Sequence, residues 1–159
     1  MRLFLFISAL ITIFSACTSS QQMEWTTDKV SIVATGPLFE GANTGTFDWS
    51  FDLAAALEGL EKVEDLMEAR LVSIELIPEA AEVLEDITIQ LAGEQAGMQK
   101  VAFMDAAGNI QVAEKQENLA SFFQDNYPTL VADFNLVEDW YDDYSIEARL
   151  TFSFKVRTN

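Results

Sequence analysis

The sequence predicts a mainly all-β protein, an antiparallel two-layer β-sandwich of about eight strands with one or two short connecting helices. Three observations predict this class. Apolar and polar residues alternate along several segments, which is typical of strands with one buried and one solvated face. The composition includes 12 Phe, and aromatic side chains fill the cores of such folds. Two packed layers are also the most economical way for eight short strands to bury one face each.

The strongest strand pattern covers residues 144–157, where apolar or aromatic side chains at even positions alternate with polar ones at odd positions. A second pattern covers residues 46–53, with Phe47 and Trp49 on one face and Asp48 and Ser50 on the other. Both predict half-buried strands of an antiparallel sheet. Weaker patterns of the same kind occupy residues 30–35, 71–77, 86–91, 100–104, 110–113 and 130–137.

The segments between these strands predict a turn and two helices. Residues 105–109, Asp-Ala-Ala-Gly-Asn, have the composition of a hairpin connection. Residues 54–67 carry apolar side chains at three- and four-residue spacing, as an amphipathic helix does. Residues 118–126 predict a second short helix, which Pro128 stops. We expect both helices to cap the ends of the sandwich.

The N-terminus has the three parts of a secretory signal. Arg2 precedes an apolar run over residues 3–14, and the small residues Ser15 and Ala16 follow it. The run is shorter than the roughly 20 apolar residues that cross a bilayer, which favours a signal over a permanent transmembrane helix. We therefore expect residues 1–16 to be removed.

The end of this signal, Phe14-Ser15-Ala16-Cys17, resembles the lipobox of bacterial lipoproteins, although that family prefers an aliphatic residue where this chain has Phe14. The resemblance implies that Cys17 is acylated and becomes the first mature residue, with no lipid-independent role. The alternative is an ordinary signal peptide that leaves Cys17 as a free thiol. By the same resemblance, Thr18 stands where an aspartate would retain the protein in the inner membrane. The resemblance thus implies an outer-membrane anchor facing the periplasm, and surface display stays open.

Residues 17–28 are predicted to be the lipidated cysteine and a polar tether, because residues 18–27 show neither a helical nor a strand pattern. Such a tether spans at most about 35 Å when extended. Its Trp25 would rest either on the membrane interface or on the domain. Residues 29–159 are predicted to form a single domain, which loosely resembles small sandwich lipoproteins whose roles are mostly unassigned.

The composition excludes several classes of function. The chain has no histidine and 1 Cys, so it has no catalytic Ser-His pair, no His-ligated zinc and no intramolecular disulfide. Its formal net charge of -17 argues against nucleic-acid binding, which needs clustered Lys and Arg. We predict that the protein is not an enzyme, and we assign no catalytic residue, no metal ligand and no cofactor.

Residues 138–143, Glu-Asp-Trp-Tyr-Asp-Asp, are the most conspicuous candidate for a site. Clustered carboxylates favour a hard cation such as calcium. Alternatively, Trp140 or Tyr141 stacks on a sugar while the acids accept hydrogen bonds from its hydroxyls. A third interpretation is a solvated acidic turn with its aromatic rings folded onto the domain, and the spacing matches no EF-hand loop.

The sequence therefore predicts a lipid-anchored cell-envelope protein that acts as a non-catalytic binding or structural module. A calcium- or glycan-binding lipoprotein that uses residues 138–143 is the alternative, and a carboxylate-dependent hydrolase is the least favoured one. The expected partners are the membrane, through the lipid on Cys17, and an unidentified protein or glycan of the envelope.

Overall fold

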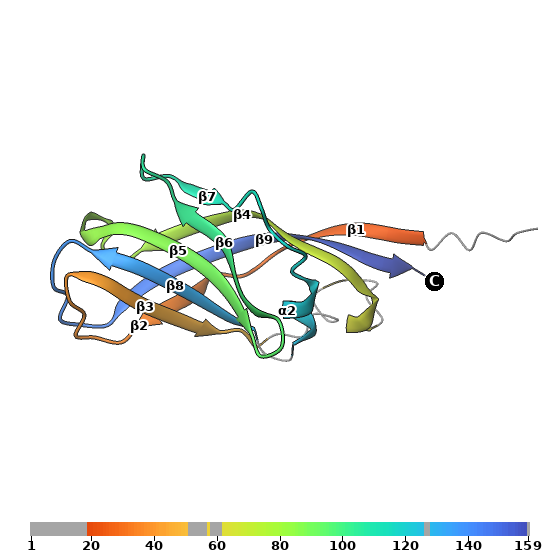
Figure 1. Cartoon of the computed structure of the whole chain (residues 1–159), viewed down its shortest axis with the longest axis horizontal. Helices are drawn as coiled ribbons and strands as arrows, with labels where there is room; N and C mark the ends of the chain where they lie inside the picture. The colour runs from red at the N-terminus through yellow and green to blue at the C-terminus, as the bar shows by residue number, and fades with distance from the viewer. Residues whose placement is uncertain (1–18, 51–56, 58–61, 126–127, 159) are drawn as a thin grey trace, which may run out of the picture.

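Figure 1 shows the computed structural model of the chain, which describes residues 19–50, 57, 62–125 and 128–158. Nine strands are formed by these residues: β1 (Ser19–Thr26), β2 (Val30–Ala34), β3 (Gly41–Asp48), β4 (Leu66–Pro78), β5 (Leu84–Gly93), β6 (Gly97–Met104), β7 (Ile110–Val112), β8 (Thr129–Leu136) and β9 (Tyr144–Thr158). They are joined in part by the 3-10 helices η1 (Val63–Asp65) and η2 (Ala81–Val83) and by the α-helix α2 (Ala120–Gln124).

All nine strands belong to one antiparallel sheet that curls around the core. The strand order is β1-β9-β2-β3-β8-β5-β6-β7, and β4 pairs with β9 off this path. The prediction of an all-β antiparallel fold is confirmed. Because the hydrogen bonding is continuous from strand to strand, the division into two separate layers stays a prediction.

β9 is the strand on which three others assemble. β4 pairs along one of its edges, while β1 and β2 share the other edge, β1 beside its C-terminal half and β2 beside its N-terminal half. β1 and the C-terminal end of β9 extend together beyond the rest of the sheet (Figure 1). Ser19 lies opposite Thr158 there, so the two ends of the described chain are neighbours.

The inner face of β9 forms the centre of the core. The even-numbered side chains from residue 144 to residue 156 are all buried: Tyr144, Ile146, Ala148, Leu150, Phe152, Phe154 and Val156. This confirms the alternation that predicted a strand over residues 144–157. Phe152 and Phe154 pack edge-on against Phe123 of α2, with ring centroids 5.0 and 5.1 Å apart. Burial of each large apolar side chain contributes about 1.5–3 kcal/mol to folding.

The weaker strand patterns are confirmed as parts of β2, β4, β5, β6, β7 and β8, and residues 105–109 connect β6 to β7 as predicted. The pattern over residues 46–53 is confirmed only at its start, because β3 ends at Asp48 and residues 51–53 lie outside the described part of the chain. The second predicted helix is confirmed in shorter form as α2. Half of the predicted helix at 54–67 lies outside the described residues, but Leu66 and Met67 begin β4, so its end was wrong.

The expectation of a tether over residues 17–28 was also wrong, since Ser19–Thr26 forms β1. β9 is long enough to offer β1 an edge after β2 has been paired, and the strand forms on that edge. Only Met23 and Trp25 turn inward, which is too short an alternation to stand out in the sequence. Trp25 lies on the domain, where its ring stacks on Trp49 at 6.1 Å and on Phe152 at 6.4 Å.

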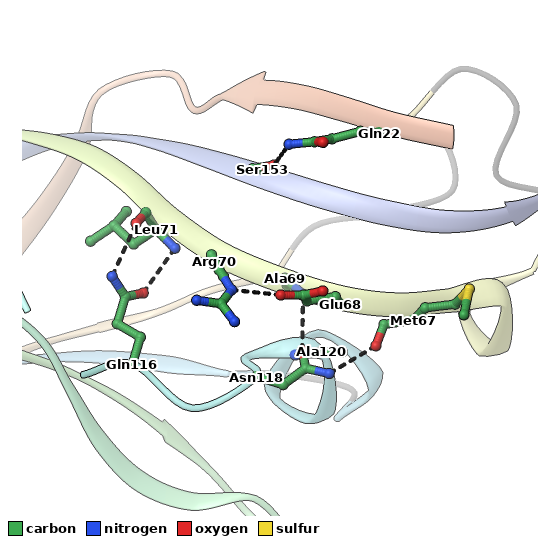
Figure 2. Close-up of polar contacts among 10 residues, drawn as sticks. All are labelled: Gln22, Met67, Glu68, Ala69, Arg70, Leu71, Gln116, Asn118, Ala120 and Ser153. Carbon is green, nitrogen blue, oxygen red and sulfur yellow. Dashed lines mark hydrogen bonds and ion pairs between the residues drawn. The ribbon is translucent and has the colours of Figure 1, made fainter. Parts of the chain in front are cut away.

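The outer edge of β4 is covered by two side-chain amides from the segment that follows β7. Gln116 accepts a hydrogen bond from the Leu71 N–H and donates one to the Leu71 carbonyl, both 3.0 Å long. Asn118 accepts from the Ala69 N–H at 2.9 Å and donates to the Met67 carbonyl at 2.8 Å. Figure 2 shows these amides reaching the strand in the manner of a neighbouring strand. They link β4 to the segment after β7, at the far end of the sheet order.

Candidate functional site

The predicted lipidation site, Cys17, lies outside the described residues, so the anchor rests on the sequence alone. The structure does place the residues next to it. β1 begins at Ser19, two residues after Cys17, and two extended residues span at most about 7 Å. Within the described residues, none of the helices has the length and apolar character needed to span a membrane.

The acidic segment 138–143 forms the turn between β8 and β9 and is held by the loop between β2 and β3. Asp139 accepts a hydrogen bond from the Glu40 N–H, and Asp143 accepts one from the Gly36 N–H, each 2.9 Å long. A side chain at Gly36 would collide with the backbone carbonyl of Asp142, so the close approach of the two loops requires glycine there. Two of the four carboxylates therefore have a structural role.

The aromatic residues of this segment differ in what they offer a ligand. Trp140 pairs with Leu38 through two backbone hydrogen bonds of 2.8 and 3.0 Å, and its ring packs edge-on against Tyr144. Tyr141 is 79% exposed. In the described part of the chain no three acidic or cysteine side chains come close enough together to hold a metal ion. The calcium and glycan alternatives at residues 138–143 thus stay predictions, and the contacts favour a structural turn.

A groove of about 750 Å³ lies elsewhere, between β6, β7 and residues 113–122. Its volume falls within the range of small-ligand sites. The larger apolar side chains of its wall are Met98, Phe103, Val112 and Phe122. The neutral polar ones are Gln99, Gln111, Asn118 and Ser121. The charged ones are Lys100, Lys115, Glu114 and Glu117. The two lysines and two glutamates balance, so the groove is locally neutral in a strongly acidic protein.

Gln99 indicates which chemical groups a ligand of this groove would carry. Its side-chain Nε2 is buried and has no hydrogen-bond partner. A buried donor without an acceptor costs about 1–3 kcal/mol, and a ligand in the groove would recover this cost if the Gln99 amide turned toward it. The Lys100 ammonium lies 4.9 Å from the centre of the Phe103 ring, where a cation–π contact holds a second donor at the groove wall.

The two carboxylates of the groove do not resemble a glycosidase pair. Glu114 and Glu117 come from one short segment on the same wall. A hydrolytic pair must flank the scissile bond from both sides. This arrangement does not favour the hydrolase alternative.

The comparisons with known proteins add no family. No protein-family model, curated protein or solved structure matches the chain. The function is therefore argued from the groove, the surface charges and the N-terminal sequence.

The sequence did not reveal the groove. Its walls come from residues 96–103 and 111–122, which carry no motif and are brought together only when the segment after β7 turns back to β4. The available signal was the run Glu114 to Asn118, which lies between the strand and the helix and is too polar to continue the strand.

Proposed function

We propose that the protein is a lipid-anchored, non-catalytic binding module of the bacterial cell envelope, and that the groove between β6, β7 and residues 113–122 holds its ligand. The unpartnered Gln99 amide in a groove of about 750 Å³ is the observation that carries the binding role. The anchor rests on the lipobox-like Phe14-Ser15-Ala16-Cys17.

The lining indicates the class of ligand. Gln99 and Lys100 supply donors, while Met98, Phe103 and Phe122 supply apolar contact. A ligand with an apolar body and a hydrogen-bond-accepting or anionic group would satisfy both. Specificity would come from the acceptor, because an unpaired buried donor penalises ligands that lack one.

The groove can be tested with the anionic dye 1-anilinonaphthalene-8-sulfonate, which has apolar rings and an accepting sulfonate. We expect saturable dye binding to the wild type, and at least a tenfold weaker binding to Ser121→Trp, because the indole would fill the groove from its exposed wall. Ser31→Trp places the same side chain on exposed β2, away from the groove, and should bind the dye as the wild type does. Equal binding by Ser121→Trp and the wild type would contradict the proposed ligand site.

The anchor is tested separately by metabolic labelling of cells with a fatty acid. The wild type should carry the label and appear in the outer-membrane fraction. Cys17→Ser should carry none and be released as a soluble protein. Label on the Cys17→Ser protein, or an unlabelled wild type, would refute lipid anchoring without affecting the groove.

A further inference from the structure

Basic residues gather on one face of this acidic protein, the outer face of β1, β9 and β4. Five of the 9 Lys and Arg lie there: Lys29, Arg70, Arg149, Lys155 and Arg157. The acids on the same face are Glu24, Glu68, Glu75, Glu147 and Glu79, whose carboxylate accepts from Ser145 of β9. Its charge is therefore 5 - 5 = 0, whereas the chain without the predicted signal, which contains Arg2, carries 8 - 26 = -18, all of it outside this face. An anionic surface would repel the rest of the molecule but not this face.

A hollow of about 250 Å³ lies on the basic face, lined by Gln22, Glu68, Arg70, Ser153 and Lys155. The strand register brings these side chains together, because Lys155 of β9 lies opposite both Gln22 of β1 and Glu68 of β4. Figure 2 shows Gln22 donating to the Ser153 hydroxyl across two strands. Four of the five side chains are hydrogen-bond donors.

Glu68 fixes the guanidinium of Arg70 beside this hollow. The Arg70 Nε donates to Glu68 Oε1 at 2.5 Å, and the Nη atoms carry further N–H donors that suit a phosphate. The Lys155 ammonium adds a second cation on the same wall. The hollow therefore combines two cationic groups, an amide and a hydroxyl, which can bind phosphate oxygens, with the Glu68 carboxylate that Arg70 already neutralises.

The short distance between the basic face and the proposed anchor favours a lipid headgroup as the source of the phosphate. Ser19 lies opposite Thr158, and Arg157 and Lys155 lie opposite Ser20 and Gln22. With the acyl chains on Cys17, only Thr18 would separate β1 from the membrane. No long tether is available to hold the basic face away from the headgroups.

We propose that the outer face of β1, β9 and β4 docks on the anionic phospholipid headgroups of the membrane that holds the lipid anchor, with a headgroup phosphate in the hollow between Gln22, Arg70 and Lys155. This inference rests on the proposed lipid anchor. The domain then lies along the bilayer. The turns at 35–41, 79–86 and 137–143, which together contain nine Asp and Glu and no Lys or Arg, lie at the opposite end of β9 from the anchor.

The test uses the full lipidated protein in vesicles that contain headgroup-spin-labelled lipid as a fluorescence quencher. A single reactive thiol is introduced as Ser73→Cys, on the proposed docking face opposite Thr151, or as Tyr141→Cys, in the distant turn. In phosphatidylglycerol-rich vesicles we expect at least twofold stronger quenching of the dye at Ser73→Cys than at Tyr141→Cys. In phosphatidylcholine vesicles the two positions should be quenched nearly equally.

Charge removal tests the contact itself. Arg70→Gln with Lys155→Gln should lower the ratio of docked to undocked protein roughly 30-fold, at about fivefold per basic residue. Lys62→Gln removes a positive charge that lines neither the groove nor the hollow, and it should leave the quenching unchanged. Equal quenching of Ser73→Cys in both lipids, or no response to the Arg70 and Lys155 changes, would overturn the docking proposal.

The anchor is read out in the same samples by sedimentation. Protein that sediments with both vesicle types but shows no preferential quenching would refute docking and leave the anchor intact. Protein that fails to sediment with either type would refute the anchor. Loss of the Ser73→Cys quenching on addition of millimolar inorganic phosphate, with the anchor still bound, would support the phosphate contact. Occupation of the hollow by free phosphate without any preferential quenching on phosphatidylglycerol would refute its assignment to lipid.

Discussion

At the scale of single residues, Tyr144 carries a hydroxyl into the core. Tyr144 is 0% exposed, and its hydroxyl donates to the Ala80 carbonyl at 2.7 Å. This bond ties the first residue of β9 to the connection between β4 and β5. Desolvation by burial raises the pKa of Tyr144 above its ordinary value, so the phenol stays protonated at neutral pH.

We expect Tyr144→Phe to lower the free energy of unfolding by about 1 kcal/mol, the usual cost of losing a hydrogen bond to a buried acceptor. Urea unfolding followed by tryptophan fluorescence measures this difference. Tyr141→Phe is the matched control, because Tyr141 is 79% exposed and should show no change. Equal stability of both variants would mean that the Tyr144 hydroxyl contributes nothing.

Asp105 organises the hairpin between β6 and β7. Its Oδ1 accepts hydrogen bonds from the backbone N–H groups of Ala107 and Asn109, both 2.9 Å long, and its Oδ2 accepts one from the Gln111 side chain. The Asn109 backbone bond is the main reason why the pKa of Asp105 lies below its ordinary value of 3.8. The hairpin therefore stabilises the ionised form of the Asp105 carboxyl.

This shift predicts the pH dependence of the hairpin. Because the folded pKa of Asp105 lies below the unfolded one, its contribution is complete above pH 3.8 and is lost as the pH falls through the lowered value. Carboxyl NMR titration should show Asp105 ionising below 3.8, and amide protection of Asn109 should fall over the same range. Asp105→Asn should remove this pH dependence. A titration at or above 3.8 would contradict the proposed role of the turn.

At the scale of elements, the amides that cover the edge of β4 are the feature with the clearest test. Gln116→Glu and Asn118→Asp keep the shape of each side chain but place a carboxylate oxygen against the carbonyls of Leu71 and Met67. We expect each change to cost about 1–3 kcal/mol at pH 7, as an unsatisfied acceptor does. The cost should shrink at pH 3, where a protonated carboxyl donates again. Gln21→Glu, on exposed β1, is the charge-matched control.

The same strand shows why some elements are predictable from sequence and others are not. β9 keeps an unbroken alternation, and all of it but the last residue, Thr158, was predicted. β4 has register shifts between Leu66 and Glu68 and between Leu71 and Ser73. Each bulge moves the following side chains to the other face, so the period is lost and only residues 71–77 were predicted as strand. The hydrogen bonds of Gln116 and Asn118 to the edge of β4 likewise produce no periodic pattern in the sequence.

At the scale of the whole molecule, the net charge of -17 governs the response to salt. The ion pairs in the described residues, Lys29 with Glu147 and Arg70 with Glu68, are exposed and contribute little. Salt therefore screens mainly repulsion between carboxylates. We expect raising NaCl from about 0.01 to 0.5 M to increase Tm by a few degrees, measured by calorimetry. An unchanged or lower Tm would show that attractive pairs dominate.

The overall class could be predicted because strand alternation depends on local sequence alone. The candidate site could not, because the groove and the basic face arise where distant segments meet. Lys155 and Gln22 are 133 positions apart, and only the pairing of β1 with β9 makes them neighbours. The turn at residues 138–143 attracted notice as a cluster of charges, although Asp139 and Asp143 hold a loop a hundred positions away.

The position of β9 in the chain also determines the order in which the protein can mature. β1 and β4 both precede it and pair with no other strand of the described sheet, and the Ser19 and Thr158 hydroxyls bond across 139 positions. If the chain is exported N-terminus first, as its N-terminal sequence predicts, β1 and β4 have no strand to pair with until residues 144–158 have passed. Sheets with such distant pairings also fold slowly. On the proposed export route, this topology would delay the pairing of β1 and β4 to the far side of the membrane.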